Sequence, residues 1–99
     1  MPQFLDVDPR ILHLPSSRAG GADPGKLTRQ LAKHGFSTQG MPPPWVTRDG
    51  NGRLQIVDGV TRATRFAKFL PGQMIRVEVI ADQPNEDYRK FPTVGDRLP

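Results

Sequence analysis

The side chains best suited to chemistry are concentrated in one short segment, Asp58-Gly59-Val60-Thr61-Arg62. The apolar run Leu54–Val57 precedes this segment and a helical pattern follows it, so the segment is predicted to connect a strand to a helix. The first N–H groups of a helix have no partner within the helix and carry a partial positive charge, which suits them to hold an anion. Gly59 would allow a sharp turn and a close approach of the ligand to the backbone. The spacing therefore indicates a phosphate-binding turn.

Side chains of the same segment strengthen this interpretation. Thr61 offers a hydroxyl donor. Arg62 and Arg65 are three residues apart and hence neighbours on one side of the helix, and guanidinium groups match the geometry of phosphate oxygens. A structural interpretation remains open: Asp58 would cap the helix, Gly59 would serve the turn, and the two arginines would be solvated. Spacing alone does not decide between the two.

Other reactive side chains are too scattered to predict a site. His13 and His34 have no third metal ligand at a useful spacing, so the histidines predict no zinc site and no metal-ligating residue is assigned. Asp6 and Asp8 could join Asp58 in an acidic cluster that binds a metal for a nuclease, but no feature of the sequence places the three together. The absence of cysteine removes disulfides, thiolate metal sites and cysteine nucleophiles.

The hydrophobic pattern predicts one small α/β (α+β) domain in which a mixed sheet of about four strands is covered by two main helices. A turn over Asp49–Gly52 is expected to join two strands as a hairpin, and Trp45, which follows three prolines, is expected to fill the core rather than to stack on a base. After a weak leading segment, Gln3–Asp8, the expected strands are Ile11–Leu14, Trp45–Thr47, Arg53–Val57 and Met74–Ile80, and the expected helices are Pro24–His34, ended by Gly35, and Val60–Leu70.

The domain is expected to span residues 1–81, and the polar, proline-containing residues 82–99 are expected to form a loosely packed tail. The net charge of +4 favours an anionic partner such as a nucleotide or nucleic acid. No apolar run is long enough to cross a bilayer, and no signal peptide is apparent. The expected location is therefore the cytoplasm, or the cytoplasm of a target cell into which the domain is delivered.

Residues 56–68, which read IVDGVTRATRFAK, resemble the signature of the ParB/sulfiredoxin superfamily, in which an apolar strand enters a G-x-x-R turn and an Ala-rich helix. Further segments are similar to that family over about residues 9–80: Ile11-x-x-Leu14-Pro15 followed by Arg18, the helix that ends at Gly35, and Pro44-Trp45-Val46.

The resemblance implies a site for the phosphates of a nucleotide, with a nucleoside triphosphate and a divalent cation such as Mg²⁺ as cofactors that such a site could use. It implies that the backbone of Gly59, Val60 and Thr61 contacts phosphate. Arg62 would contact it through its side chain, with Arg18 as a second ligand from the first loop and Arg65 as a lesser one. Asp58 and Arg62 are the catalytic candidates, Asp58 as a cation ligand or base.

Departures from the family limit what it implies. Without a cysteine in the turn, sulfiredoxin activity is excluded, and the residues after Ile80 are too few for the DNA-reading and dimerisation domains of partition proteins. A small-metabolite kinase of the serine kinase type is doubtful because Glu78 and Glu86 are the only glutamates. The remaining functions are a nuclease or nucleotide-hydrolysing toxin domain, which would have a cognate immunity protein as partner, and a non-catalytic module that binds DNA or protein.

Overall fold

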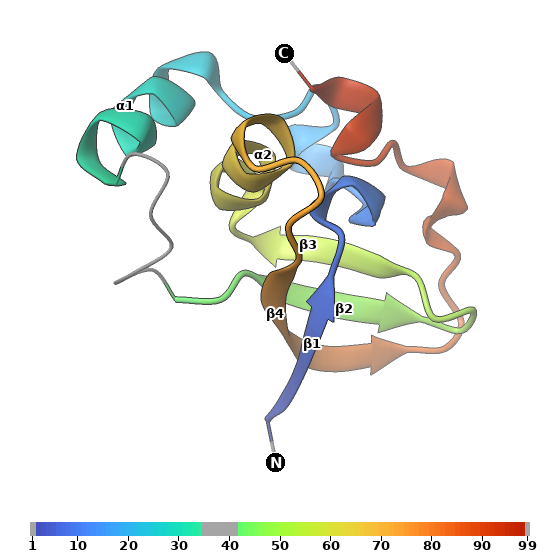
Figure 1. The fold of residues 1–99 in the computed structure, drawn as a ribbon. Helices are drawn as coiled ribbons and strands as arrows, with labels where there is room; N and C mark the ends of the chain where they lie inside the picture. Colours follow the sequence, from blue (N-terminus) through green and yellow to red (C-terminus); the bar gives the residue numbers. More distant parts are fainter. Residues whose placement is uncertain (1, 35–41, 99) are drawn as a thin grey trace.

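The computed structural model describes residues 2–34 and 42–98. Four strands form one mixed sheet accompanied by two helices, which is the fold class that the sequence predicts (Figure 1). The elements are β1 (Gln3–Val7), α1 (Pro24–His34), β2 (Trp45–Asp49), β3 (Leu54–Asp58), α2 (Val60–Phe69) and β4 (Ile75–Gln83). The predicted helix stop at Gly35 lies outside the described residues. None of the described helices is long and apolar enough to cross a bilayer.

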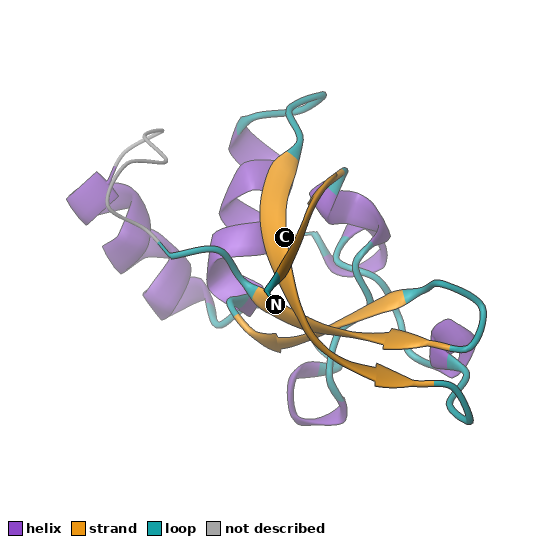
Figure 2. Cartoon of the chain, turned by 90° about the horizontal axis from the view of Figure 1, so that it is seen from below, coloured by secondary structure: helices purple, strands orange, loops and turns teal. Residues whose placement is uncertain are grey.

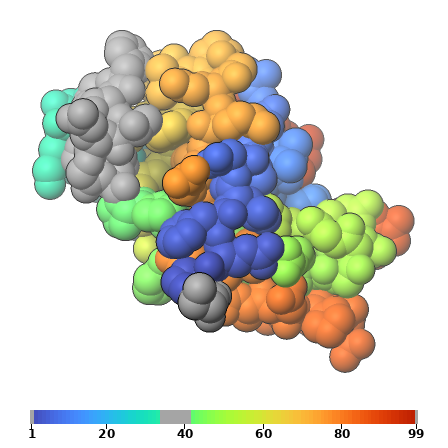
Figure 3. All heavy atoms as spheres, turned by 60° about the horizontal axis from the view of Figure 1, so that its bottom comes forward, coloured from blue at the N-terminus to red at the C-terminus, as the bar shows by residue number. Residues whose placement is uncertain are grey.

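The sheet has the strand order β1-β4-β2-β3, in which β2 and β4 are parallel and the other pairs are antiparallel. β1 forms one edge of this sheet and runs across the surface of the molecule (Figure 3, dark blue). The predicted hairpin is confirmed as β2 and β3. Its turn forms because the carboxylate of Asp49 accepts hydrogen bonds from the N–H groups of Asn51 (2.9 Å) and Arg53 (2.8 Å).

The helix that follows β3 supplies one side of the core. The apolar residues of α2 recur at helical spacing, so they share one face and bury it against the sheet. α1 packs against α2 and lies outside it in both ribbon views (Figure 1, Figure 2). The core residues of α2 are Val60, Ala63, Phe66 and Ala67, and the strands contribute Val46, Leu54, Ile56, Ile75, Val77 and Val79.

The first strand differs from the prediction. Ile11–Leu14 is not a strand, because Pro9–Ile11 forms a 3₁₀ turn that is capped by the Asp8 carboxylate. The leading segment instead contains β1, which pairs with β4. His13 still makes a single bridge to the β3 edge: its N–H donates to the Leu54 carbonyl (2.8 Å). The apolar residues of Ile11–Leu14 therefore indicate that Leu12 and Leu14 are buried, not that the segment is a strand.

β3, α2 and β4 follow one another along the chain as predicted, but β3 and β4 are not neighbours in the sheet. β2 lies between β3 and β4 in the sheet, and the two are antiparallel to each other because β2 is antiparallel to one and parallel to the other. The predicted junction at Gly59 is confirmed, since this residue separates the end of β3 from the start of α2.

The prediction that residues 82–99 are a loosely packed tail is wrong. Tyr88 and Val94 are each only 1% exposed, and Val94 belongs to the core. The Tyr88 N–H donates to Asp49 Oδ2 (2.8 Å), and its hydroxyl lies 2.7 Å from Thr47 Oγ1. Burial alone would raise the pKa of Asp49, but the backbone N–H donors outweigh it and lower this pKa. The segment has no regular hydrophobic spacing because it folds as short 3₁₀ turns, in which single apolar side chains pack into the core.

Trp45 does not fill the core, and this expectation is also wrong. Its side chain is 47% exposed, whereas the next residue, Val46, is fully buried. Successive side chains of a strand point to opposite faces of the sheet, so burial of Val46 beneath α2 turns Trp45 to the other face. Trp45 pairs there with Asp58 of β3 and Glu78 of β4. The single tryptophan of the chain therefore lies beside the end of β3.

Candidate functional site

The turn between β3 and α2 has the geometry of an uncapped helix start. Gly59 is the N-cap residue, with φ +111° and ψ +22°, and the first helical bond runs from the Ala63 N–H to the Gly59 carbonyl (2.9 Å). Because glycine has no side chain, the N-cap position cannot accept a bond from the N–H groups of Thr61 or Arg62. These donors at the end of a ten-residue helix are the part of the site that would attract an anion.

Gly59 also packs directly on Pro44, the residue before β2. A Cβ atom at position 59 would lie 2.7 Å from the Pro44 Cβ and 3.0 Å from its Cα. The position thus requires glycine for two reasons: a positive φ that side chains rarely adopt, and a close approach of two backbones. The structural interpretation of Gly59 is correct, and it does not conflict with a role in binding.

Gly59→Ala is expected to destabilise the domain more than Gly72→Ala, measured as the free energy of unfolding in urea. Both glycines have positive φ, but position 72 has no atom within 4 Å of an added Cβ. Strain alone costs about 1–3 kcal/mol, and displacement of Pro44 adds a cost of about the same size. Equal losses for the two variants would contradict the close contact with Pro44.

A polar pocket of about 420 Å³ opens in front of this turn. It gathers most of the residues that the sequence predicts for the site, and residues from separate segments of the chain converge on it. Its predicted members are Arg18, Asp58, Gly59, Val60, Thr61 and Arg62, and its further lining residues are Pro15, Ser17, Lys26, Gln30 and Val57. We call this space the turn pocket.

Arg18 and Lys26 bring positive charge to the turn pocket from outside the turn. Arg18 ends a 3₁₀ turn, Ser16–Arg18, and Lys26 lies in the first part of α1. Both are exposed, and neither forms an ion pair with another described residue. Sequence reasoning missed Lys26 and Gln30, which are one helical turn apart. Their spacing of four residues shows that they share one face of the helix, but it does not show that this face is directed toward the turn.

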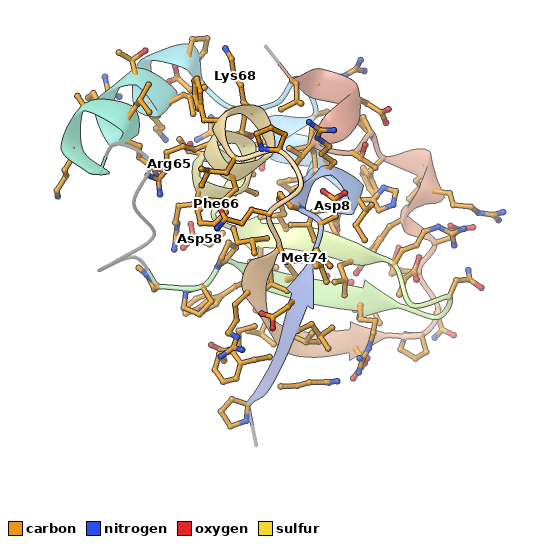
Figure 4. The ribbon with its side chains drawn as sticks, viewed as in Figure 1. Asp8, Asp58, Arg65, Phe66, Lys68 and Met74 are labelled. Carbon is orange, nitrogen blue, oxygen red and sulfur yellow. The ribbon has the colours of Figure 1, made fainter. Side chains whose placement is uncertain are left out.

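Arg62 is held in place by two acceptors. Its Nη1 donates to the Pro42 carbonyl (2.7 Å) and its Nη2 to Asp58 Oδ2 (3.1 Å). The Arg62 side chain is only 14% exposed, whereas that of Asp58 is 67% exposed. Ion pairs with an exposed partner contribute little stability, so an arriving phosphate could replace the Asp58 carboxylate at the guanidinium. Asp58 lies at the end of β3, below α2 (Figure 4).

The structure does not bring Arg65, which the sequence predicts as a phosphate ligand, into the turn pocket. Arg65 is 1% exposed and is not among the residues that line the turn pocket. Its guanidinium carbon lies 5.6 Å from the centre of the Phe66 ring, and burial lowers the pKa of the guanidinium. A separation of three residues turns a helical side chain by about 60°. That rotation places Arg65 on the side of α2 that faces α1 (Figure 4).

The three aspartates considered for a metal site are not brought together. Asp6 pairs with Arg76 (3.1 Å), and Asp8 caps the 3₁₀ turn after β1. In the described ranges no group of three His, Asp or Glu side chains is placed to hold a metal ion. Asp58 is thus the single carboxylate among the described residues of the turn pocket.

A second, more apolar pocket of about 440 Å³ adjoins the turn pocket. Arg62 lines both, and the apolar one is walled by Pro42–Pro44 together with Phe66 and Met74. A ligand with a phosphate in the turn pocket thus has an apolar surface on the other side of Arg62.

Comparison with protein-family models, with curated proteins and with solved structures found no match. The resemblance to the ParB/sulfiredoxin superfamily therefore stays a hypothesis that depends on the motif residues.

Proposed function

We propose that this domain binds phosphate groups of a nucleotide or nucleic acid in the turn pocket. One observation carries the proposal: Arg18, Lys26 and the segment 58–62, which come from three separate parts of the chain, converge on one polar pocket. Uncompensated cations beside an uncapped helix start form a favourable environment for an anion. The adjoining apolar pocket favours a phosphate that carries an organic group, such as a nucleoside.

In this proposal each residue has a distinct role. The N–H groups of Val60 and Thr61 donate to phosphate oxygens, and Arg62 donates from its planar guanidinium. Arg18 and Lys26 contribute charge from the facing side of the pocket. Asp58 opposes binding of a free anion, because its carboxylate already forms an ion pair with the Arg62 guanidinium that the phosphate would contact.

Binding is the better supported function, and hydrolysis or transfer of a phosphoryl group is the second candidate. The exposed Asp58 carboxylate favours the latter, since Mg²⁺ is commonly held by one or two carboxylates together with the phosphates of a substrate. Asp58 would then hold the cation against a nucleoside triphosphate. The two functions differ in one measurable respect: the second requires that Mg²⁺ strengthens triphosphate binding and that Asp58→Asn abolishes this gain.

Arg18→Ala is expected to weaken binding of pyrophosphate and of a nucleoside triphosphate about tenfold or more, the usual cost of one charge-assisted hydrogen bond. Arg18 is exposed, so the melting temperature should stay unchanged. Fluorescence of Trp45, which pairs with Asp58, offers a direct readout. Lys68→Ala is the matched control, because it removes the same charge from the far end of α2. Equal affinities for the two variants would contradict the proposal.

A further inference from the structure

The helix α1 carries more positive charge toward the turn pocket than a single phosphate requires. Lys26 and Gln30 line the pocket, so their face of α1 looks onto it. At 100° per residue, Lys33 lies about 20° from Lys26 around the helix axis, on the side away from Gln30, and Arg29 lies about 60° from Lys26 on that same side. Lys26, Arg29 and Lys33 are all exposed. We call this set, with Arg18, the cationic row.

In the described ranges, no carboxylate forms an ion pair with a member of the cationic row. The sequence has no Asp or Glu between Asp23 and Asp49. Asp23 is the nearest acid in sequence, and its carboxylate accepts a hydrogen bond from the Gly25 N–H at the start of α1 (2.9 Å). The ion pairs between described residues involve other cations: Arg48, Arg62, Arg76, Arg89 and Lys90. Like charges one helical turn apart destabilise a helix. The row therefore lowers the stability of α1, and a bound polyanion would remove this loss.

The length of the cationic row sets the size of the ligand. Lys26 and Lys33 are seven residues apart, which is about 10 Å along the helix. Phosphates of one nucleic-acid strand are at least about 3.4 Å apart, which is their spacing along a duplex axis, so the row is long enough to meet more than one phosphate. A mononucleotide in the turn pocket would reach Arg18 and Lys26 but would leave Arg29 and Lys33 without a partner.

We infer that the ligand is a nucleic-acid strand whose backbone continues from the turn pocket along α1, over Lys26, Arg29 and Lys33. This inference rests on the proposed function and specifies its substrate class. One phosphate of the strand occupies the turn pocket and fixes the register, and the phosphates next to it lie on the cationic row. The contacts are to the backbone, so they carry affinity without base specificity.

The test removes the distal half of the row. Arg29→Ala/Lys33→Ala should weaken binding of a short single-stranded DNA about tenfold or more at low salt, and leave pyrophosphate binding unchanged. The slope of log affinity against log salt should fall by about 1.4, that is about 0.7 for each lost phosphate contact on a single strand. Lys68→Ala/Lys90→Ala removes the same charge elsewhere and should change neither quantity comparably. Alanine favours helix, so α1 is retained.

The outcomes separate the inference from the function on which it rests. If the distal variant binds the DNA like the wild type while Arg18→Ala loses pyrophosphate, the pocket serves a small ligand and the inference is wrong. If the wild type binds neither pyrophosphate nor DNA, the proposed function fails as well. Matching RNA and duplex DNA distinguish the form of the strand. An acidic polypeptide that binds as tightly as DNA would also overturn the inference.

Discussion

Removal of residues 84–99 is expected to unfold the domain. This truncation keeps β4 whole but deletes Tyr88 and Val94, each 1% exposed. Deleting a large buried aromatic side chain costs about 3–5 kcal/mol, and a small domain has only about 5–15 kcal/mol of stability. Backbone hydrogen bonds also disappear, among them those from the Leu14 N–H to the Pro92 carbonyl (2.8 Å) and from the Val94 N–H to the Leu12 carbonyl (2.8 Å).

Thermal unfolding followed by circular dichroism tests this expectation. The truncated chain should show no cooperative transition. Tyr88→Phe is the matched control, because it keeps the ring and removes only the hydroxyl that contacts Thr47 and Gln83, for a loss of about 1–3 kcal/mol. A truncated chain that melts cooperatively at the wild-type temperature would mean that the packing of this segment contributes little.

The second large effect is expected on binding. Arg62→Ala should weaken the affinity for pyrophosphate and for short single-stranded DNA about tenfold to a hundredfold, because it removes a charge-assisted donor that the fold already holds in place. Arg62 also bonds the Pro42 carbonyl (2.7 Å), so its loss could loosen the segment before β2. A second variant has to separate these two consequences.

Asp58→Asn makes that separation. It abolishes the Asp58–Arg62 ion pair but keeps the guanidinium and its bond to Pro42. If Arg62 binds phosphate, Asp58→Asn should bind pyrophosphate at least as tightly as the wild type in the absence of Mg²⁺, while Arg62→Ala loses binding. If both variants lose affinity equally, the ion pair has a structural role and Arg62 is not a phosphate ligand.

The sequence predicts those parts of the fold that depend on local signals. Both helices and the hairpin are recognisable because their apolar spacing, turn glycines and caps lie within a few residues of one another. Burial that depends on distant partners is not recognisable in this way. β1 forms because it pairs with β4, and Tyr88 is buried where it forms hydrogen bonds with Asp49 and Thr47. Neither partnership leaves a periodic pattern in the sequence.

The same distinction holds for the site. The contiguous turn 58–62 is predictable, since a strand, a glycine and a helix follow one another there. Lys26 and Gln30 reach the pocket only because α1 packs on α2, which helical spacing does not reveal. Arg65 shows the converse case: its type suits phosphate, but the packing of α2 buries it.

The central claim is that the start of α2 binds phosphate, and a titration of the isotope-labelled protein with pyrophosphate, followed by ¹H–¹⁵N NMR, tests it most directly. The backbone amide signals of Val60, Thr61 and Arg62 should show the largest shifts, saturating together with the side-chain signal of Arg18. The Gly72 amide, in a turn beyond the other end of α2, should not respond. Amide signals of residues 60–62 that stay unmoved while the protein binds pyrophosphate elsewhere would contradict the account.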